Sequence, residues 1–355
     1  MIQAVSHVRM MAPYALADLG GKSTVSLAQN ESAFAASPAA IAAGQKALTA
    51  VPLYPDPDWT DLRNAIAEVH RLTPQHILCG AGSMELIGSL IRAFAGADDR
   101  VLGTDYAYAY VASAVAQVQA DYVTAREVGF TVAVDEILTS VTPQVRIVFV
   151  CNPGNPTGTI IPNADILRLR DSLPRDVLLV VDQAYGEFSD ADNDPRQIFA
   201  LVERGDTVVM RTFSKAYGLA GARAGWGYFP PAIATEVRKL LNPNNISIPS
   251  QAMAAAAMRD QPYMQDTVRK TAAIRNEFAK GCRALGLEVP ASHTNFVLIR
   301  FATTEQAERA DQALQAAGLL MRRMAGYGLA DCLRATICDT PVMQRCLAVL
   351  KGVLS

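Results

Sequence analysis

The sequence lacks the features that mark a membrane-spanning, secreted or metal-binding protein. No apolar run approaches the ~20 residues that a helix needs to cross a bilayer, and the run at 177–181 has the length of a strand. The N-terminus has no succession of charged, apolar and small-residue zones typical of a signal peptide. The six cysteines form no C-x-x-C pair, and the four histidines show no metal-ligand spacing. We therefore expect reduced, mostly buried thiols, no metal site and a cytoplasmic location.

An excess of charge of one sign is also missing. The chain has 32 Lys and Arg residues against 34 Asp and Glu residues, a net charge of −2 at pH 7. This balance excludes a basic surface for nucleic acid or for a membrane. Half of the residues are apolar and 19% are charged, which is enough apolar material for a large core. A length of 355 residues suggests two domains, or one large α/β domain with a smaller one.

Short apolar runs and amphipathic segments alternate along the first two thirds of the chain. Residues 75–79, 145–151, 177–181 and 207–211 have the apolar, β-branched character of strands that are buried on both faces. Between them, 61–70, 84–95, 110–119 and 164–173 have helical spacing. This alternation predicts an α/β fold with a largely parallel sheet covered by helices on both faces.

The pattern changes near residue 240. A cluster of Asn and Pro at 242–245 interrupts it, and alanine-rich helices and short strands follow. We expect a smaller α+β domain there. The change places a domain boundary near residue 240.

Polar residues follow four of the predicted strands. Gly80-Ala81-Gly82-Ser83 opens a helix after the first, and Asn155 lies in the turn after the strand at 145–151. Asp182 and Tyr185 follow the next strand. A last group follows the strand at 207–211: Thr212, Ser214, Lys215 and Arg223. Ligands of open parallel sheets bind beyond the carboxyl ends of the strands, so these side chains should meet.

A phosphate turn, an amide, a carboxylate and a lysine together fit one cofactor, pyridoxal 5'-phosphate. A lysine can form a Schiff base with its aldehyde, and a carboxylate can keep its ring nitrogen protonated. Backbone amides at a helix start suit its phosphate, and an arginine can grip the phosphate with two hydrogen bonds.

Three motifs in this order carry a resemblance to a known family. They are Asn155-Pro156-Thr157-Gly158, Asp182-Gln183-Ala184-Tyr185, and Ser214-Lys215-Ala216-Tyr217-Gly218 with Arg223. The chain resembles the fold-type I pyridoxal-phosphate aminotransferases of class I and II. Within them it is most similar to histidinol-phosphate aminotransferases and their aromatic aminotransferase relatives, over nearly its whole length. The resemblance implies an α/β fold whose large, cofactor-binding domain at 46–240 holds a mostly parallel, seven-stranded sheet flanked by helices. It also implies an N-terminal arm at 1–45 that joins the small domain, and a small C-terminal α+β domain at 241–355.

The resemblance implies a role for each matching residue. Lys215 would bind the cofactor and move the proton, Asp182 would pair with the ring nitrogen, and Asn155 and Tyr185 would contact the ring oxygen; Lys215, Asp182 and Tyr185 are the expected catalytic group. The expected remaining cofactor contacts are Gly82, Ser83, Thr212, Ser214 and Arg223 at the phosphate, Tyr108 on the ring, and Tyr54 from the partner subunit of a homodimer. The expected substrate contacts are Arg334 at the α-carboxylate, and Asn30, Tyr14 and Arg322.

Departures from the family pattern leave the substrate and the outcome open. Gln183 stands where the family often has Glu, and Asn30-Glu31-Ser32-Ala33 replaces Asn-Glu-Asn-Pro beside the substrate side chain. The expected donor is histidinol phosphate or an aromatic amino acid, and the expected acceptor is a 2-oxoacid such as 2-oxoglutarate. The alternatives are a decarboxylase of the threonine-phosphate type and a cofactor-binding regulator without catalysis. Which of Tyr106, Tyr108 and Tyr110 stacks on the cofactor also stays open.

Overall fold

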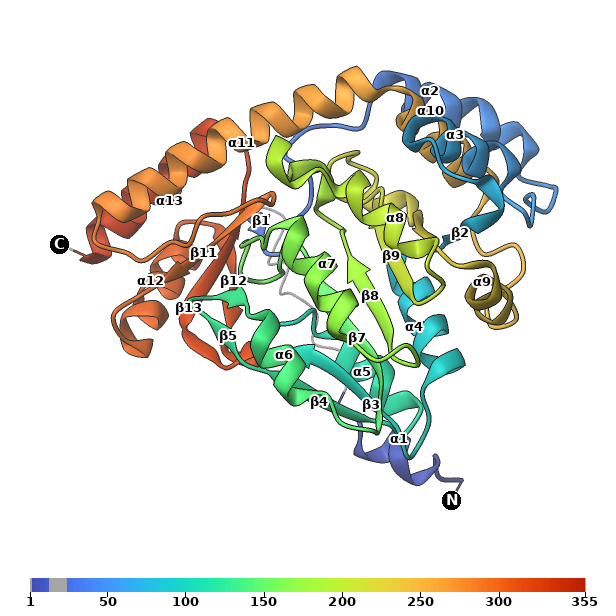
Figure 1. The fold of residues 1–355 in the computed structure, drawn as a ribbon. Helices are drawn as coiled ribbons and strands as arrows, with labels where there is room; N and C mark the ends of the chain where they lie inside the picture. The colour runs from blue at the N-terminus through green and yellow to red at the C-terminus, as the bar shows by residue number, and fades with distance from the viewer. Residues whose placement is uncertain (1, 13–23, 355) are drawn as a thin grey trace.

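A seven-stranded sheet forms the centre of the larger part of the molecule in this computed structural model, which describes residues 2–12 and 24–354 (Figure 1). Its strands, in spatial order, are β2 (Ile77–Gly80), β10 (Gly225–Tyr228), β9 (Thr207–Thr212), β8 (Leu178–Asp182), β7 (Val145–Cys151), β3 (Arg100–Thr104) and β4 (Asp121–Ala125). The strand β10 runs antiparallel to both of its neighbours, and the other six strands share one direction. The expected α/β fold with a mostly parallel seven-stranded sheet is confirmed.

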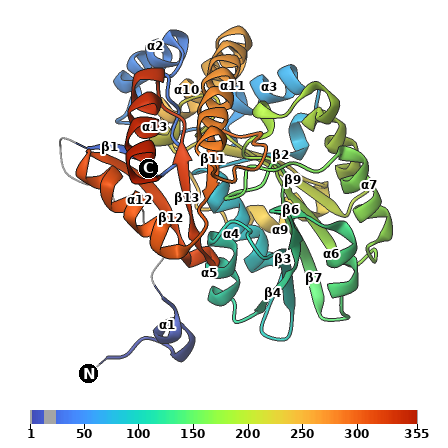
Figure 2. The same ribbon diagram turned by 90° about the vertical axis from the view of Figure 1, so that its left-hand side faces the viewer.

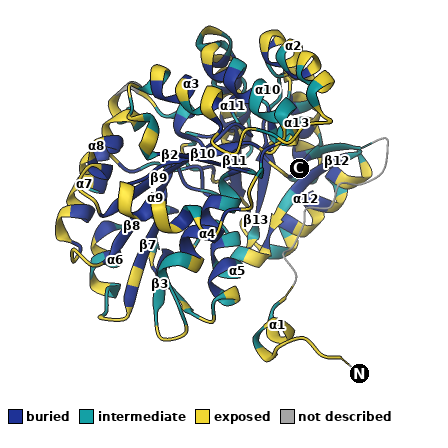
Figure 3. Ribbon diagram, turned by 90° about the vertical axis from the view of Figure 1, so that its right-hand side faces the viewer, coloured by how far each residue is buried: buried dark blue, intermediate teal, exposed yellow. Residues whose placement is uncertain are grey.

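Helices cover both faces of this sheet, which explains why its central strands are mostly apolar. Figure 2 shows α4 and α5 on one side and α6 and α7 on the other. The helices of this part are α3 (Thr60–His70), α4 (Ser83–Phe94), α5 (Tyr110–Gln117), α6 (Val134–Ser140), α7 (Asn163–Ser172), α8 (Phe199–Val202) and α9 (Pro231–Arg238). Every strand of this sheet except β4 is almost entirely buried, while the outer helix faces are exposed (Figure 3).

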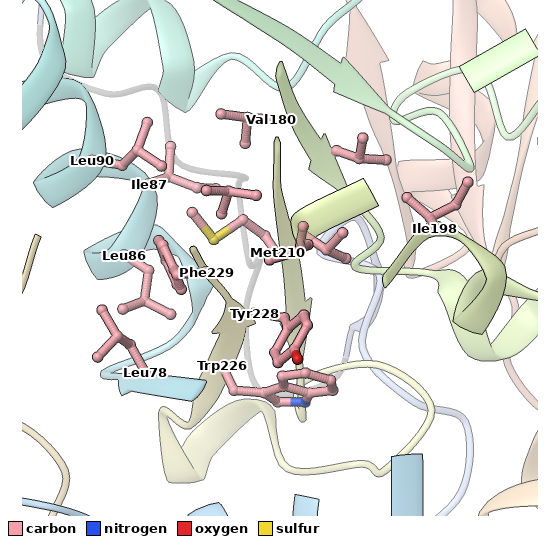
Figure 4. Close-up of a cluster of buried hydrophobic side chains, with 14 of the residues drawn as sticks. Leu78, Leu86, Ile87, Leu90, Val180, Ile198, Met210, Trp226, Tyr228 and Phe229 are labelled. Atoms are coloured by element: carbon pink, nitrogen blue, oxygen red, sulfur yellow. The ribbon is translucent and has the colours of Figure 1, made fainter. Parts of the chain in front are cut away.

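The helix α4 shows how the sequence builds this packing. Leu86, Ile87 and Leu90 recur at helical spacing and are buried. In Figure 4 they face Met210 of β9 and Phe229, which follows β10. The helix is therefore fixed against the sheet, and its first turn is held at the sheet edge where the site lies.

A second sheet of four strands forms the smaller part of the molecule. Its spatial order is β1 (Val25–Leu27), β12 (Leu319–Met324), β13 (Leu329–Thr336) and β11 (Phe296–Arg300). Its helices are α11 (Gln261–Ala284), α12 (Thr304–Ala316) and α13 (Thr340–Leu354). The strand β1 pairs in parallel with β12, so the N-terminal segment joins the sheet of the C-terminal part. The remaining elements are α1 (Ser6–Met10), α2 (Pro38–Ala47), α10 (Ile248–Arg259) and the hairpin of β5 (Glu127–Val128) and β6 (Thr131–Val132).

The two apolar cores meet along α11. Met264, near the start of this helix, belongs to the core of the larger sheet, whereas Phe278 belongs to that of the smaller one. Figure 1 shows α11 running from the region of α2 and α10 to the smaller sheet. The helix α10, which the sequence pattern places in the C-terminal domain, contributes Ala254 and Met258 to the larger core. The division of the chain at residue 240 remains a prediction. In the structure, α10 packs with the part of the molecule that precedes this residue.

All six cysteines are free thiols, and five of them are buried. Within residues 2–12 and 24–354, no helix combines the length and apolar character that a membrane crossing requires. The same residues contain no group of three or more His, Cys, Asp or Glu side chains placed to hold a metal ion.

Candidate active site

A cavity of about 560 Å³ lies where strands β7, β8 and β9 end. Its other walls come from the segment 28–31 after β1, the start of α4, and strands β12 and β13 of the smaller sheet. The predicted residues that line it are Asn30, Gly82, Ser83, Tyr108, Asn155, Asp182, Tyr185, Thr212, Ser214, Lys215, Arg223, Arg322 and Arg334. The fold therefore brings together residues that lie far apart in the sequence, from Asn30 to Arg334.

One end of the cavity is built around the turn before α4. Gly82 has a φ of +80°, which glycine adopts without strain. A Cβ atom at Gly82 would collide with the guanidinium of Arg223, so the glycine lets this cation approach the turn. Glu85 and Asn245 brace the turn from behind: Glu85 Oε2 accepts hydrogen bonds from the Ala81 amide at 2.7 Å and from Asn245 Nδ2 at 2.6 Å.

Two hydroxyl groups complete this end. Thr212 Oγ1 donates to Ser214 Oγ at 3.0 Å and accepts from the Ser214 amide at 3.1 Å. The first amides of α4 have no helical acceptor, and the helix dipole adds partial positive charge there. Together with Arg223, these groups make a binding site for an anion of phosphate type.

Lys215 and Asp182 approach the middle of the cavity from the loop after β9 and from the end of β8. Burial lowers the pKa of Lys215 to about 7, and the charges of Arg334 and Arg223 act in the same direction. Burial also raises the pKa of Asp182 to about 7, although the Ala184 amide and the charge of Lys215 oppose the rise. The site therefore holds an amine that loses its proton near neutral pH and a carboxyl group that lacks a strong cationic partner.

The segment 28–31 turns four backbone carbonyl groups toward side chains of the site. Lys215 Nζ donates to the Gln29 and Asn30 oxygens at 3.1 and 3.0 Å. Arg334 Nη2 donates to the Ala28 oxygen at 2.9 Å. Asn295 Nδ2, just before β11, donates to the oxygens of Asn30 and Glu31, each at 3.0 Å. The segment is thereby held between the two sheets.

Arg334 is buried, and its guanidinium donates to Asn155 Oδ1 at 2.6 Å while lying over the ring of Phe296. Asn155 belongs to a turn after β7 that is closed by a hydrogen bond from the Gly158 amide to the Gly154 oxygen at 3.0 Å. An arginine that is already oriented in this way can accept a carboxylate with little further ordering.

The side chains of Tyr106, Tyr108 and Tyr110, which follow β3, have different surroundings. Tyr108 lines the cavity. The ring of Tyr106 packs on Phe130 with a centroid separation of 6.0 Å, and the hydroxyl of Tyr110 lies against Gly88 of α4. Tyr108 is therefore the one of the three that is placed to stack on a ligand.

One predicted residue, Tyr54, lies away from the cavity, and another cannot be placed. Tyr54 is 87% exposed and does not line the cavity. Tyr14 lies outside the described residues. Sequence patterns did not point to Asn295 or Thr336 at all, although both bind Asn30. Neither residue follows a parallel strand or forms part of a recognised motif, so no local signal identifies them.

These residues suit pyridoxal phosphate. The anion end, the buried carboxyl group of Asp182 and the amine of Lys215 match the phosphate, ring nitrogen and aldehyde of that cofactor. The cavity volume of about 560 Å³ also falls within the range of roughly 300–1,000 Å³ typical of small-ligand sites.

Comparison with known proteins identifies the class. The family model for aminotransferases of class I and II matches residues 22–350. A histidinol-phosphate aminotransferase of Cereibacter sphaeroides is 40% identical over 333 residues, which cover 92% of each chain. The crystal structure of histidinol-phosphate aminotransferase from Sinorhizobium meliloti, in complex with pyridoxal-5'-phosphate, superposes with a TM-score of 0.87 at 29% identity and covers 93% of this chain and 90% of that one.

A more distant structure shares the fold. An aspartate aminotransferase of Thermus thermophilus has a TM-score of 0.86 at 19% identity and covers 99% of this chain and 100% of that one. The chain belongs to the aminotransferases of class I and II. It is therefore an enzyme that transfers amino groups, and the resemblance that its three motifs indicate is confirmed.

Proposed function

We propose that the chain is a pyridoxal-phosphate-dependent aminotransferase that moves an amino group between histidinol phosphate, or an aromatic amino acid, and a 2-oxoacid such as 2-oxoglutarate. The observation that carries the proposal is the placement of Lys215 and Asp182 in one cavity, between the anion site at Arg223 and the guanidinium of Arg334. The printed names of the relatives in C. sphaeroides and S. meliloti favour histidinol phosphate.

The bound cofactor would act as an electron sink that stabilises negative charge at the substrate Cα. Lys215 would attach to it and carry the proton, for which a pKa of about 7 is well placed because the amine can both accept and return a proton near neutrality. Asp182 would hold the ring nitrogen in its charged form. The other proposed cofactor contacts are Gly82, Ser83, Tyr108, Asn155, Tyr185, Thr212, Ser214 and Arg223.

Two arginines on adjacent strands of the smaller sheet would bind the substrate. Arg322 of β12 and Arg334 of β13 stand opposite each other in the sheet register, and both line the cavity. Arg334 would bind the α-carboxylate. Arg322 would bind the phosphate at the far end of the substrate, together with Tyr14.

Comparing two donors tests this assignment. We expect Arg322→Met to lower kcat/KM with histidinol phosphate by a factor of about 10 to 100, because a charge-assisted hydrogen bond contributes roughly 1.5–3 kcal/mol. The value with phenylalanine should change little. The matched control is Arg323→Met, since the neighbouring Arg323 pairs with Glu308 and Asp311 outside the site. Equal losses with both donors would contradict the phosphate role of Arg322.

We also propose a homodimer that acts in the cytoplasm. The exposed side chains Leu48, Val51, Leu53 and Tyr54 form a run of apolar and aromatic surface after α2, and an apolar surface of this kind favours a protein contact. A partner subunit would cover it and would bring Tyr54 to the cofactor phosphate. The free thiols support a reducing compartment. The relatives compared above are all named aminotransferases, so the decarboxylase alternative gains no support.

A further inference from the structure

Asn30 has every one of its polar groups engaged inside the protein. It is 2% exposed and has a φ of 56°. Its amide N–H donates to Thr336 Oγ1 at 2.9 Å, and its carbonyl oxygen accepts from Lys215 and Asn295. Its side-chain Nδ2 donates to the Tyr185 hydroxyl at 2.8 Å, and its Oδ1 accepts from Thr336 Oγ1 at 3.3 Å. Both polar atoms of its side chain are therefore bonded within the protein.

Two hydrogen bonds with Thr336 orient the side-chain amide of Asn30. A backbone N–H can only donate, so the Asn30 amide occupies a lone pair of Thr336 Oγ1. The hydroxyl proton of Thr336 is then available to Asn30 Oδ1. With Oδ1 facing Thr336, the NH₂ group of Asn30 must face the oxygen of Tyr185. Since an NH₂ group offers no acceptor, the proton of Tyr185 has to point to another partner.

The geometry leaves the cavity as the place for that proton. Tyr185 lines the cavity, and its ring is fixed edge-on against Phe296 at a centroid separation of 5.2 Å. We propose that Thr336 is a positioning residue: through Asn30 it fixes Tyr185 as a hydrogen-bond donor into the cavity. This inference rests on the proposed function, because the acceptor would be the ring oxygen of bound pyridoxal phosphate.

Thr336 could instead matter through packing alone. It is buried in β13 and stands opposite Phe296 in the register with β11. Two substitutions separate these roles. Thr336→Val keeps the shape of the side chain and removes the hydroxyl group, whereas Thr336→Ser keeps the hydroxyl group and removes the methyl group.

The measurement is a pH titration of the visible absorption of the holoenzyme, without substrate. A hydrogen bond donated to the ring oxygen stabilises its anionic form, so losing that donor raises the pH midpoint of the titration. In Thr336→Val the Asn30 amide group can rotate, and its oxygen can then take the proton of Tyr185. We expect a midpoint about one pH unit higher, a tenfold change in proton affinity, and a midpoint close to that of the wild type in Thr336→Ser.

The charged and titratable neighbours of Tyr185 are the same in both variants. They are Arg334, Asp182, Cys151 and Lys215, whose Nζ lies 5.9 Å from the centre of the Tyr185 ring. A difference between the Val and Ser variants therefore reports on the hydroxyl group. If Thr336→Val does not fold, Thr336→Ala tests the same step, because it removes the hydroxyl group that Thr336→Ser keeps and changes no charge, and we again expect a higher midpoint.

A double-mutant cycle closes the test. If Thr336 acts through Tyr185, then Thr336→Val in a Tyr185→Phe background should not move the midpoint further. Equal midpoints in the wild type and both Thr336 variants would overturn the inference while leaving the proposed function intact. A full shift in the Tyr185→Phe background would overturn it too. A wild type that binds no pyridoxal phosphate would instead defeat the proposed function itself.

Discussion

Lys215 and Asp182 have pKa values that burial moves in opposite directions, toward about 7 in both cases. Desolvation disfavours the charged form of each side chain, which lowers the pKa of an amine and raises that of a carboxyl group. Such shifts lower the free energy of unfolding. A ligand that supplies the missing partner for each group offsets this loss when it binds. The site therefore lowers the folding stability of the ligand-free protein and raises its affinity for the ligand.

The role of Lys215 gives the first prediction. Lys215→Ala should lower transamination to the background rate, because the substitution removes both the attachment point and the proton carrier. It should also abolish the cofactor–protein adduct that borohydride reduction traps, which mass spectrometry detects. The control is Lys280→Ala, on the exposed side of α11. Retained turnover in Lys215→Ala would contradict the assignment.

The pKa of Asp182 determines how we expect the stability of the cofactor-free protein to depend on pH. Its pKa in the folded state, about 7, lies above the ordinary value of 3.8, so the folded protein binds a proton more tightly than the unfolded chain. The unfolding free energy therefore falls as pH rises from 3.8 to about 7, and it stays lower above that. Asp182→Asn removes this cost and still leaves an oxygen to accept from the Ala184 amide.

We expect Asp182→Asn to be more stable than the wild type by about 2–4 kcal/mol at pH 8, and by little at pH 4. Urea unfolding of the two cofactor-free proteins at both pH values measures this. Asp98→Asn, an exposed carboxylate, is the control. The same Asp182 substitution should weaken cofactor binding. A stability difference that does not vary between pH 4 and pH 8 would show that the carboxyl group is not desolvated as described.

Among the structural elements, β10 shows where local sequence signals mislead. Its sequence Gly225-Trp226-Gly227-Tyr228 contains two glycines, which are uncommon in strands, and the periodicity of the chain does not predict it. The structure explains the first glycine. A Cβ atom at Gly225 would lie 2.6 Å from the Gly82 carbonyl carbon and would also collide with the Ser83 amide nitrogen. The glycine allows β10 to pack against the turn that forms the anion site.

Gly225→Ala should therefore push this turn away from its position. We expect a loss of roughly 1–3 kcal/mol in the unfolding free energy and a cofactor dissociation constant raised at least tenfold. Equilibrium dialysis with pyridoxal phosphate and thermal unfolding measure the two effects. Gly352→Ala in α13, where an added Cβ meets nothing within 4 Å, should be neutral or slightly stabilising. Unchanged cofactor binding in Gly225→Ala would contradict this account of the turn.

The site residues that the sequence predicted correctly are marked by signals in the neighbouring sequence. Asp182 and Thr212 end parallel strands, and Gly82 precedes a helix, so a rule about strand ends was enough to place them. Thr336 and Asn30 are 306 positions apart and meet because β1 and β13 belong to one sheet. Neither residue has a local pattern that identifies its partner. Contacts of this kind depend on how distant segments pack, which the periodicity of a single chain does not specify.

At the scale of the whole molecule, the site lies between two sheets with separate cores. The larger sheet supplies Asp182 and Lys215, the smaller sheet supplies Arg322 and Arg334, and the segment 28–31 connects them. The alternation of strands and helices predicted the larger sheet well. The exposed run Leu48, Val51, Leu53 and Tyr54 belongs to neither core, which is why the account of the molecule includes a second subunit.

The predicted homodimer can be measured directly. Sedimentation equilibrium should give twice the chain mass of 38.0 kDa. Leu53→Glu places a charge in the exposed apolar run and should shift the equilibrium toward the monomer, with a loss of activity because Tyr54 no longer reaches the partner's cofactor. Val128→Glu, which alters an exposed apolar residue far along the chain, is the control. A wild type that sediments as a monomer at full activity would contradict a shared site.

The central claim is that this cavity holds pyridoxal phosphate on Lys215 and uses it to transfer amino groups. The most direct test is the near-ultraviolet and visible spectrum of the purified protein, recorded before and after excess L-glutamate and again after 2-oxoglutarate. The account predicts a visible band of lysine-bound cofactor that glutamate removes and 2-oxoglutarate restores. A protein that shows no such band, even after added pyridoxal phosphate, would contradict the account.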